Sequence, residues 1–317
     1  MADAKDIRAE LREATTLSAM SLTGAAVAVA AIVAVIAVFL FADSERQRDL
    51  DVWEGRLGIV AETRAAAVDE WIGQQYRELG ALAENASLQL YMTELSRPPA
   101  PSGRLTEEFA ESGYLRNLLT VVAGKAGYLS EPGGPDIGAN VERVAVSGIA
   151  LVGSGGEIFA ATRGMPPLDP VRHRDVLAPP GEARGLLDIH VAPNGEAVIG
   201  FSVPVYGIQQ GGAARALGRV VGIRRVDHAL FDLLKQPGFA WTSSEILLVR
   251  GRDGAAEYLS PRRGGRPPLS DTHATGTRDV VAAIVVRDGA RFGTAPDYTG
   301  ASVLYAARPL AGVPWSA

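Results

Sequence analysis

Hydrophobic and polar residues follow three successive patterns along the chain, and the first is an apolar run near the N-terminus. No residue from 14 to 42 carries a formal charge, and 24–42 contains only apolar side chains or glycine. At ~1.5 Å rise per residue, the inner run would be about 28 Å long as a helix, close to the hydrocarbon thickness of a bilayer. We therefore predict a transmembrane helix at 14–42, preceded by a cytoplasmic tail at 1–13.

Two other interpretations of this run are a cleaved signal peptide and a buried helix of a soluble protein. Signal peptides have a basic leader and a shorter apolar region, whereas the leader here is of mixed charge. A buried soluble helix is rarely apolar on all sides over such a length. Lys5, Arg8 and Arg12 precede the run while Arg46 and Arg48 follow it, which leans toward a cytoplasmic N-terminus.

The second pattern is a helical stripe directly after the apolar run. Between Leu50 and Leu82 apolar residues recur at steps of three or four, the spacing of one helix face. No proline occurs before Pro98, so the membrane helix can continue without a break into a long helix at 43–96. Prolines near 98–101 are expected to end it, and a further helix is predicted at about 106–126.

The third pattern begins near position 142, where short apolar runs alternate with glycine-containing turns. This is typical of antiparallel strands. The sequence predicts an α+β fold with two PAS-like antiparallel-sheet sensor domains in tandem: a membrane-distal domain at 97–238 and a membrane-proximal domain at 239–317. We expect the second to be truncated, because the chain stops in an apparent strand. The predicted strands are 143–152, 157–162, 186–191, 196–203, 217–224, 245–250, 255–260, 290–296 and 301–308, with helices at 227–234 and 278–287.

Composition excludes several kinds of function. The formal net charge is -5 without long blocks of like charge, so the sequence offers no basis for nucleic-acid binding. The chain has no cysteine and four scattered histidines, which argues against a metal site. The glycine-rich stretch 153–156 joins two predicted strands and is a turn, not a phosphate-binding loop. We find no catalytic motif and predict no cofactor, although the chain could still be the N-terminal part of an enzyme.

Three stretches carry a family resemblance: 244–254, 257–261 and 297–315, with weaker similarity at 155–159 and 202–205. With the membrane span and the long helix, they resemble the double Cache sensor region, a tandem periplasmic PAS-like fold, of bacterial receptors, most of all sensor histidine kinases. The resemblance implies a homodimer in the bacterial inner membrane with most of the chain extracytoplasmic. It also implies that a small molecule binds the distal fold. The long helix would then signal to a cytoplasmic output outside this chain, a histidine kinase or sometimes a diguanylate cyclase.

Five residues are candidate ligand contacts in the distal domain. An arginine can hold a carboxylate through two parallel hydrogen bonds, and a carboxylate facing a cavity needs a cationic partner. Alternation along the third strand places Asp188 on the side of Leu186 and His190, opposite Leu187 and Ile189; the alternative is that Asp188 and His190 face solvent. No Trp or Tyr accompanies 172–174, so the amino-acid specificity of some family members does not carry over, and a carboxylate or amine ligand is expected. The candidates are Arg172, Arg174, Asp188, His190 and Tyr206.

Two other functions compete with the receptor. The chain could be a membrane-anchored periplasmic enzyme with an active site that its motifs do not reveal. It could also be an adaptor that binds a periplasmic partner through its sheet edges. Ligand-dependent stabilisation separates the receptor from the adaptor.

Overall fold

The computed structural model describes residues 3–96, 105–129, 146–179, 183–207, 216–235, 244–276 and 279–317, with side chains from 29 onward and, in the third helix, from 113. Helices and antiparallel strands make up 42% and 27% of the chain, which confirms the α+β class. The chain divides into two units, Met1–Ile59 and Val60–Ala317. All sheets of the described residues lie in the second unit.

Helix α1 (Asp3–Ala83) is continuous, as the absence of proline predicted. Its predicted end near 96 was wrong, because the chain breaks after Ala83 and starts a new helix, α2 (Ala86–Leu95). Asn85 caps α2: its side-chain oxygen accepts a hydrogen bond from the backbone N–H of Leu88 at 3.1 Å. The predicted third helix is confirmed as α3 (Leu105–Lys125). The proline-rich breaks predicted after 96 and at 132–135 lie outside the described residues.

The predicted membrane span falls only in part on residues with described side chains. Among those residues, no helix is both long and apolar enough to cross a bilayer. The side chains of 14–28 lie outside the described residues. The structure therefore does not confirm the span.

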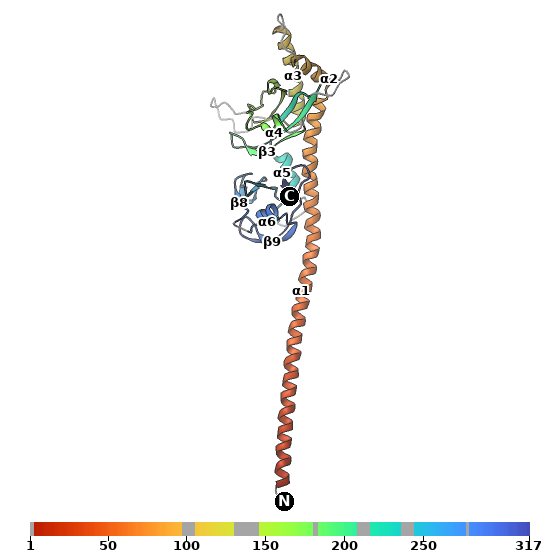
Figure 1. Ribbon diagram of the computed structural model, residues 1–317, viewed down its shortest axis with the longest axis vertical. Coiled ribbons are helices and arrows are strands. Elements are labelled where there is room, and N and C mark those ends of the chain that lie inside the picture. The colour runs from red at the N-terminus through yellow and green to blue at the C-terminus, as the bar shows by residue number, and fades with distance from the viewer. Residues whose placement is uncertain are drawn as a thin grey trace. The chain divides into compact units, whose positions relative to one another are not determined.

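The first lobe (residues 146–235, green to cyan in Figure 1) contains one five-stranded antiparallel sheet, ordered β2-β1-β5-β4-β3. Its strands and helix α5 match the predicted elements within a few residues. Gly156 and Gly195 adopt φ +88° and +85° in the two tight turns, a conformation that glycine tolerates. The elements are β1 (Gly148–Gly153), β2 (Ile158–Ala161), α4 (Arg174–Leu177), β3 (Gly185–Val191), β4 (Ala197–Tyr206), β5 (Ala216–Arg225) and α5 (His228–Leu234).

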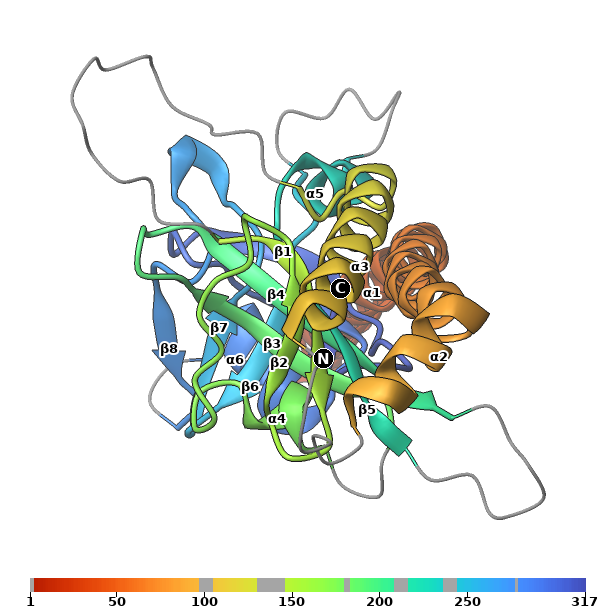
Figure 2. The ribbon, with the colours of Figure 1, turned by 90° about the horizontal axis from the view of Figure 1, so that it is seen from above.

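This sheet is buried on both faces. One face packs against α1, α2 and α3, shown in orange to yellow in Figure 2, through residues such as Ile199, Phe201 and Val220. The other face carries Val198 and Val221 and packs against α4 and the chain around it. Because both faces are covered, β1 and β5 are almost continuously buried rather than alternating.

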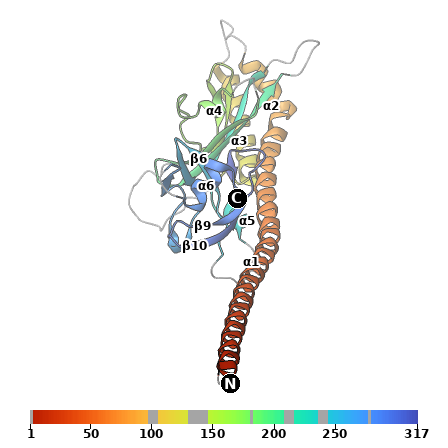
Figure 3. The same ribbon diagram turned by 60° about the horizontal axis from the view of Figure 1, so that its bottom comes forward.

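The second lobe (residues 244–317) contains a four-stranded sheet, ordered β11-β6-β7-β8, and a β9–β10 hairpin. Helix α6 packs against β6, β7 and β9; Figure 3 shows it near β6 and β9. The predicted strand pairs and helix are present with shorter bounds, and the last residues form β11, which pairs with β6. The elements are β6 (Val249–Arg252), β7 (Ala255–Tyr258), η2 (Arg263–Gly265), β8 (Thr272–Ala274), α6 (Val281–Asp288), β9 (Phe292–Pro296), β10 (Ser302–Ala306) and β11 (Trp315–Ser316).

Residues 60–83 of α1 contact both lobes. The rings of Trp71 and Tyr76 meet Phe201 of the first lobe edge to face, with centroids 6.1 and 5.2 Å apart. The Asp69 carboxylate accepts hydrogen bonds from the backbone N–H groups of Ala311 at 2.9 Å and Gly312 at 3.3 Å in the second lobe. This part of α1 and the two lobes therefore share one hydrophobic core.

Candidate functional site

Strand β3 carries a β-bulge at the position of Asp188. Leu187 pairs with Gly200 of β4 and His190 pairs with Val198, so two residues of β3 lie opposite one residue of β4. Simple alternation fails here: Leu187 belongs to the core on the α4 side, whereas Ile189 belongs to the core on the α1 side. The sequence-based prediction that these two residues share a face was wrong for this reason.

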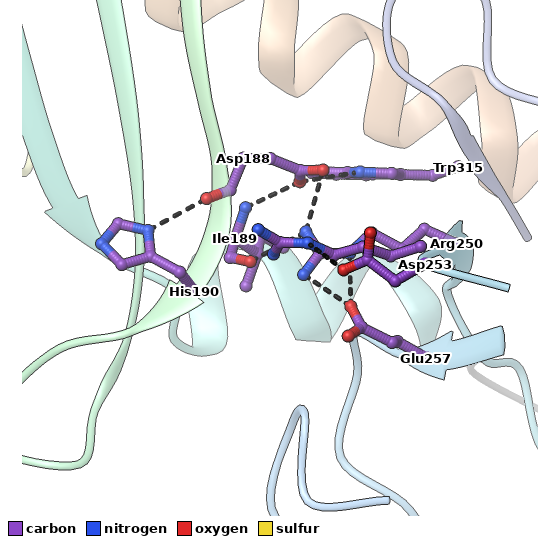
Figure 4. A network of polar contacts seen from close by, with 8 residues as sticks. Asp188, Ile189, His190, Arg250, Asp253, Glu257 and Trp315 are labelled. Carbon is purple, nitrogen blue, oxygen red and sulfur yellow. Dashed lines mark hydrogen bonds and ion pairs between the residues drawn. The ribbon is translucent and has the colours of Figure 1, made fainter. Parts of the chain in front are cut away.

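The bulge directs Asp188 toward the second lobe, where it pairs with Arg250 of β6 (Figure 4). An Asp188 carboxylate oxygen lies 2.8 Å from the Arg250 guanidinium, and the other oxygen accepts a hydrogen bond from the Trp315 indole N–H at 3.0 Å. The second oxygen also accepts one from the Ile189 backbone N–H at 2.7 Å. Asp188 is therefore only partly exposed, has a cationic partner, and forms part of a junction between the lobes.

Arg250 is the centre of this junction. Its side chain is 3% exposed and pairs with the Glu257 carboxylate of β7 at 2.7 Å. It also donates to the backbone carbonyl of Ile189 at 2.8 Å. Two carboxylates and a carbonyl give the buried guanidinium partners on several sides, as a desolvated charge requires. The Asp188–Arg250–Glu257 network therefore fixes β6 and β7 to the bulge of β3.

His190 lies at the other side of the bulge, near the turn that leads into α4. Its ring Nδ1 is 3.0 Å from the Asp188 backbone oxygen. Burial lowers the pKa of His173, and the nearby charge of His190 lowers it further. His173 sits in the Asp169–His173 turn, where its Nδ1 accepts a hydrogen bond from the Asp169 backbone N–H at 2.8 Å. The structure thus brings His190 close to the predicted 172–174 segment. Its neighbour there is His173, not one of the two predicted arginines.

The other three predicted ligand residues have exposed side chains. Arg172 and Arg174 flank the buried His173 and point to solvent, and Tyr206 at the end of β4 is 36% exposed. Asp188 and His190 meet none of them through a hydrogen bond or ion pair in the described part of the chain. The ligand role of these five residues stays a prediction.

Sequence reasoning missed a polar pair on the sheet face remote from α1. Arg219 of β5 is 7% exposed and donates from Nε to the Ser202 hydroxyl of β4 at 3.1 Å, and from a terminal nitrogen to the Ala183 carbonyl. Ser202 is fully buried. The alternation of residues 217–224 predicts that Arg219 and Val221 share a face of the strand. Nothing in the sequence shows that this face is the one remote from α1.

No cluster of metal-binding side chains occurs among the described residues. The buried polar groups on the sheet face remote from α1 include the Arg219 guanidinium and the Ser202 hydroxyl. They suit hydrogen bonding to an anionic group better than metal coordination.

No family model matches the chain, and no curated protein matches it. Two of the solved structures to which this chain is similar are matched at 12% identity and a TM-score of 0.43 each. One, an extracellular ligand-binding receptor from Desulfohalobium retbaense DSM5692, is matched over 82% of this chain, which spans only 39% of that protein. The other, described as the "extracellular domain of the putative histidine kinase soHK1S-Z6", is matched over 84% of this chain and 92% of its own length. Likenesses of this size establish neither a family nor an activity.

Proposed function

We propose that this chain is the extracytoplasmic small-molecule sensing region of a bacterial membrane receptor. The observation that carries the proposal is that one helix segment, residues 60–83 of α1, is bonded to both lobes and continues without a break toward the N-terminus. A change in either lobe must therefore act on the same helix. The sheet order β2-β1-β5-β4-β3, with helices on both faces, supports a PAS-like first lobe.

In this proposal, the segment 14–42 crosses the membrane. Its support within the described side chains is the run from Val29 to Phe41, where the large apolar residues are between 52% and 72% exposed. Such a run on a helix requires an apolar environment, and lipid supplies one on all sides. We further propose, with support from the resemblance of the sequence to double Cache receptors, that both lobes are extracytoplasmic and that the output is of the kinase type.

The ligand is proposed to bind the first lobe on the sheet face remote from α1, next to Arg219 and Ser202. A buried guanidinium with a neighbouring hydroxyl matches a carboxylate, which it can hold by charge-assisted hydrogen bonds. The same β4 and β5 strands carry Phe201 and Arg224 on their opposite face, where α1 packs. A ligand that shifts these strands would act on α1, but only by its difference in affinity for the two arrangements.

A thermal-shift screen of the full chain in detergent, with carboxylates, amines and amino acids, tests this proposal. A ligand at about 100 times its dissociation constant stabilises the folded state by about 2.7 kcal/mol, enough for a clear rise in melting temperature. With the compound that gives this rise, Arg219→Lys should reduce the shift because a lysine cannot make the bidentate contact. Arg225→Met, at a half-exposed position on the same strand, is the matched control and should leave it unchanged.

Asp188→Ala distinguishes the two candidate positions. A smaller ligand shift in this variant would place the ligand near the bulge, and an unchanged shift would remove Asp188 from the site. If neither Arg219→Lys nor Asp188→Ala alters the shift of any stabilising compound, the first lobe is not the ligand-binding site. If no compound stabilises the chain, the result favours the adaptor hypothesis over the receptor.

A further inference from the structure

The second lobe contains an aromatic box that is filled by an arginine of the same chain. The guanidinium carbon of Arg262 lies 4.7 Å from the ring centroid of Tyr258 and 5.3 Å from that of Tyr298. The His273 ring meets Tyr258 edge to face at 5.7 Å. Tyr258 comes from β7 and Tyr298 from the β9–β10 turn, so two separated segments converge on one cation, and His273 of β8 packs behind Tyr258.

The walls of the box suit a positive charge. Burial raises the pKa of Tyr258 to about 12, so its ring is a neutral phenol at physiological pH. The Tyr298 hydroxyl donates to the Glu245 carboxylate at 2.6 Å, which adds a negative charge beside the box. Ring faces and a nearby carboxylate both favour an organic cation over a neutral or anionic group.

Arg262 is held less completely than the buried Arg250. One of its terminal nitrogens donates to Ser270 at 2.8 Å, and the other lies 2.6 Å from Asp271. Its buried Nε has no hydrogen-bond partner among the described residues. The Asp271 side chain is 43% exposed and is shared with Arg266, so solvent weakens the pairing. The rings are therefore a large part of what retains the guanidinium.

The segment that carries Arg262 is mostly exposed, and a backbone contact holds it to the rest of the lobe: the Arg263 N–H donates to the Glu245 carboxylate at 2.9 Å. Residues 263–267 are exposed, and the turn contains Gly264 and Gly265 with φ near +75°. A backbone bridge between Arg262 and Arg266 closes this turn. Ser270 and Asp271, the side-chain partners of Arg262, follow it in the sequence. The segment is a short surface strap with one buried side chain.

We propose that the Tyr258–Tyr298 box is a second ligand site, for a small organic cation with an alkylammonium or guanidinium head, and that Arg262 occupies it when no ligand is bound. A tethered side chain competes at an effective concentration in the mM range, so the ligand binds only the fraction of molecules in which the strap is open. The site lies in the second lobe and does not depend on the ligand proposed for the first.

Fluorine NMR of the full chain labelled with 3-fluorotyrosine tests the proposal. The probe is tetramethylammonium chloride, with sodium chloride at equal ionic strength as reference, and Tyr258→Phe and Tyr298→Phe assign the two resonances. We expect saturable shifts of both resonances in the unmodified chain. In Arg262→Ala, half-saturation should fall at a probe concentration at least about tenfold lower, because the internal competitor is gone.

Two further variants keep the test decisive. Asp271→Asn retains the Arg262 side chain but weakens its ion pair, so it should also lower the probe concentration at half-saturation. This variant serves as the test if Arg262→Ala fails to fold. Arg252→Ala removes an exposed arginine of the same lobe, outside the box, and should leave half-saturation within about twofold of the unmodified chain. The proposal is overturned if the unmodified chain shows no saturable shift, or if half-saturation is the same with and without Arg262.

Discussion

Two buried arginines join parts of the second unit, and they do so by different means. Arg250 joins the two lobes and has two carboxylates and a backbone carbonyl as partners. Arg224, on β5, joins the first lobe to α1. It donates to the Gln75 side-chain oxygen at 2.8 Å and to the Ala126 carbonyl at 3.3 Å, with no carboxylate bonded to it among the described residues.

Aromatic rings take the place of carboxylates around Arg224. Its guanidinium carbon lies 5.2 Å from the Trp71 ring centroid and 5.6 Å from that of Tyr128. Three buried polar atoms of this region have no hydrogen-bond partner among the described residues: the Arg224 Nε, the Tyr128 hydroxyl and a Glu78 carboxylate oxygen. Burial raises the pKa of Tyr128 well above its ordinary value.

The comparison teaches that the joint between the lobes is fixed by paired charges, whereas the joint between sheet and helix is fixed by ring packing and neutral dipoles. Paired charges have one favourable geometry, and breaking them leaves a costly buried charge. Ring faces accept a guanidinium over a range of positions. In the proposed receptor, the helix–sheet joint is therefore the one suited to small displacements of α1.

The largest predicted effect is that of Arg250→Met. Removing the guanidinium leaves Asp188 and Glu257 without their partner, and we expect a loss of about 3 kcal/mol in folding stability, the lower end of the usual range because Asp188 is 32% exposed. Urea unfolding followed by tryptophan fluorescence measures it. Arg252→Met, exposed on the same strand, should change stability by less than about 0.5 kcal/mol. Equal losses in both variants would show that the junction is not held by charge pairing.

Gly222→Ala should cost about 2 kcal/mol, because a Cβ on this β5 glycine would lie 2.5 Å from the Tyr128 ring that faces Arg224. The effect tests how tightly the helix–sheet joint is packed. The matched glycine is Gly80 of α1, where a Cβ meets nothing within 4 Å and alanine should stabilise by up to about 1 kcal/mol. Thermal melts of both variants give the comparison, and a neutral Gly222→Ala would mean that Tyr128 can move aside.

Arg224→Met should lose about 1 kcal/mol, clearly less than Arg250→Met. The variant loses two hydrogen bonds and two ring contacts, but it also removes a buried charge that has no carboxylate partner. A double-mutant cycle with Gln75→Leu measures the coupling, expected at about 0.5–1.5 kcal/mol. If Arg224→Met destabilises as much as Arg250→Met, the distinction between the two joints fails.

The smallest effect concerns pH and the buried His173 of the first lobe. Burial lowers the pKa of His173 from its ordinary value of 6.5, so on acidification the unfolded chain binds a proton before the folded chain does. The stability from neutral His173 is complete above about pH 6.5 and is lost as pH falls. Melting temperatures at pH 7.5, 6.5 and 5.5 should fall more steeply for the unmodified chain than for His173→Gln. Parallel curves would contradict a role for His173.

Most strands could be predicted because their signals are local. Alternating or continuous apolar runs bounded by glycine turns, such as those at Gly156 and Gly195, determine strand and hairpin without knowledge of the tertiary structure. The break between α1 and α2 was missed although Asn85 is a good helix cap, because the apolar stripe continues across it and no proline or glycine marks it.

The sites could not be predicted because their partners are remote in sequence. Asp188 was singled out, but its orientation depends on a bulge that is visible only in the pairing of β3 with β4. Its partner Arg250 lies in another sheet, and Arg219 differs from surface arginines only by the face of β5 that it occupies. Residues 172 and 174 were chosen for charge alone, whereas the buried member of that segment is His173.

The central claim, that both lobes lie outside the cytoplasm on a helix that crosses the membrane, can be tested directly because the chain has no cysteine. Val171→Cys places a thiol at a side-chain position that is 85% exposed in the first lobe, and Ala4→Cys places one before the apolar run. In intact bacterial cells that express the full chain, a membrane-impermeant maleimide should label the Val171→Cys protein without permeabilisation and the Ala4→Cys protein only after it. Labelling of Val171→Cys only after permeabilisation would contradict the account.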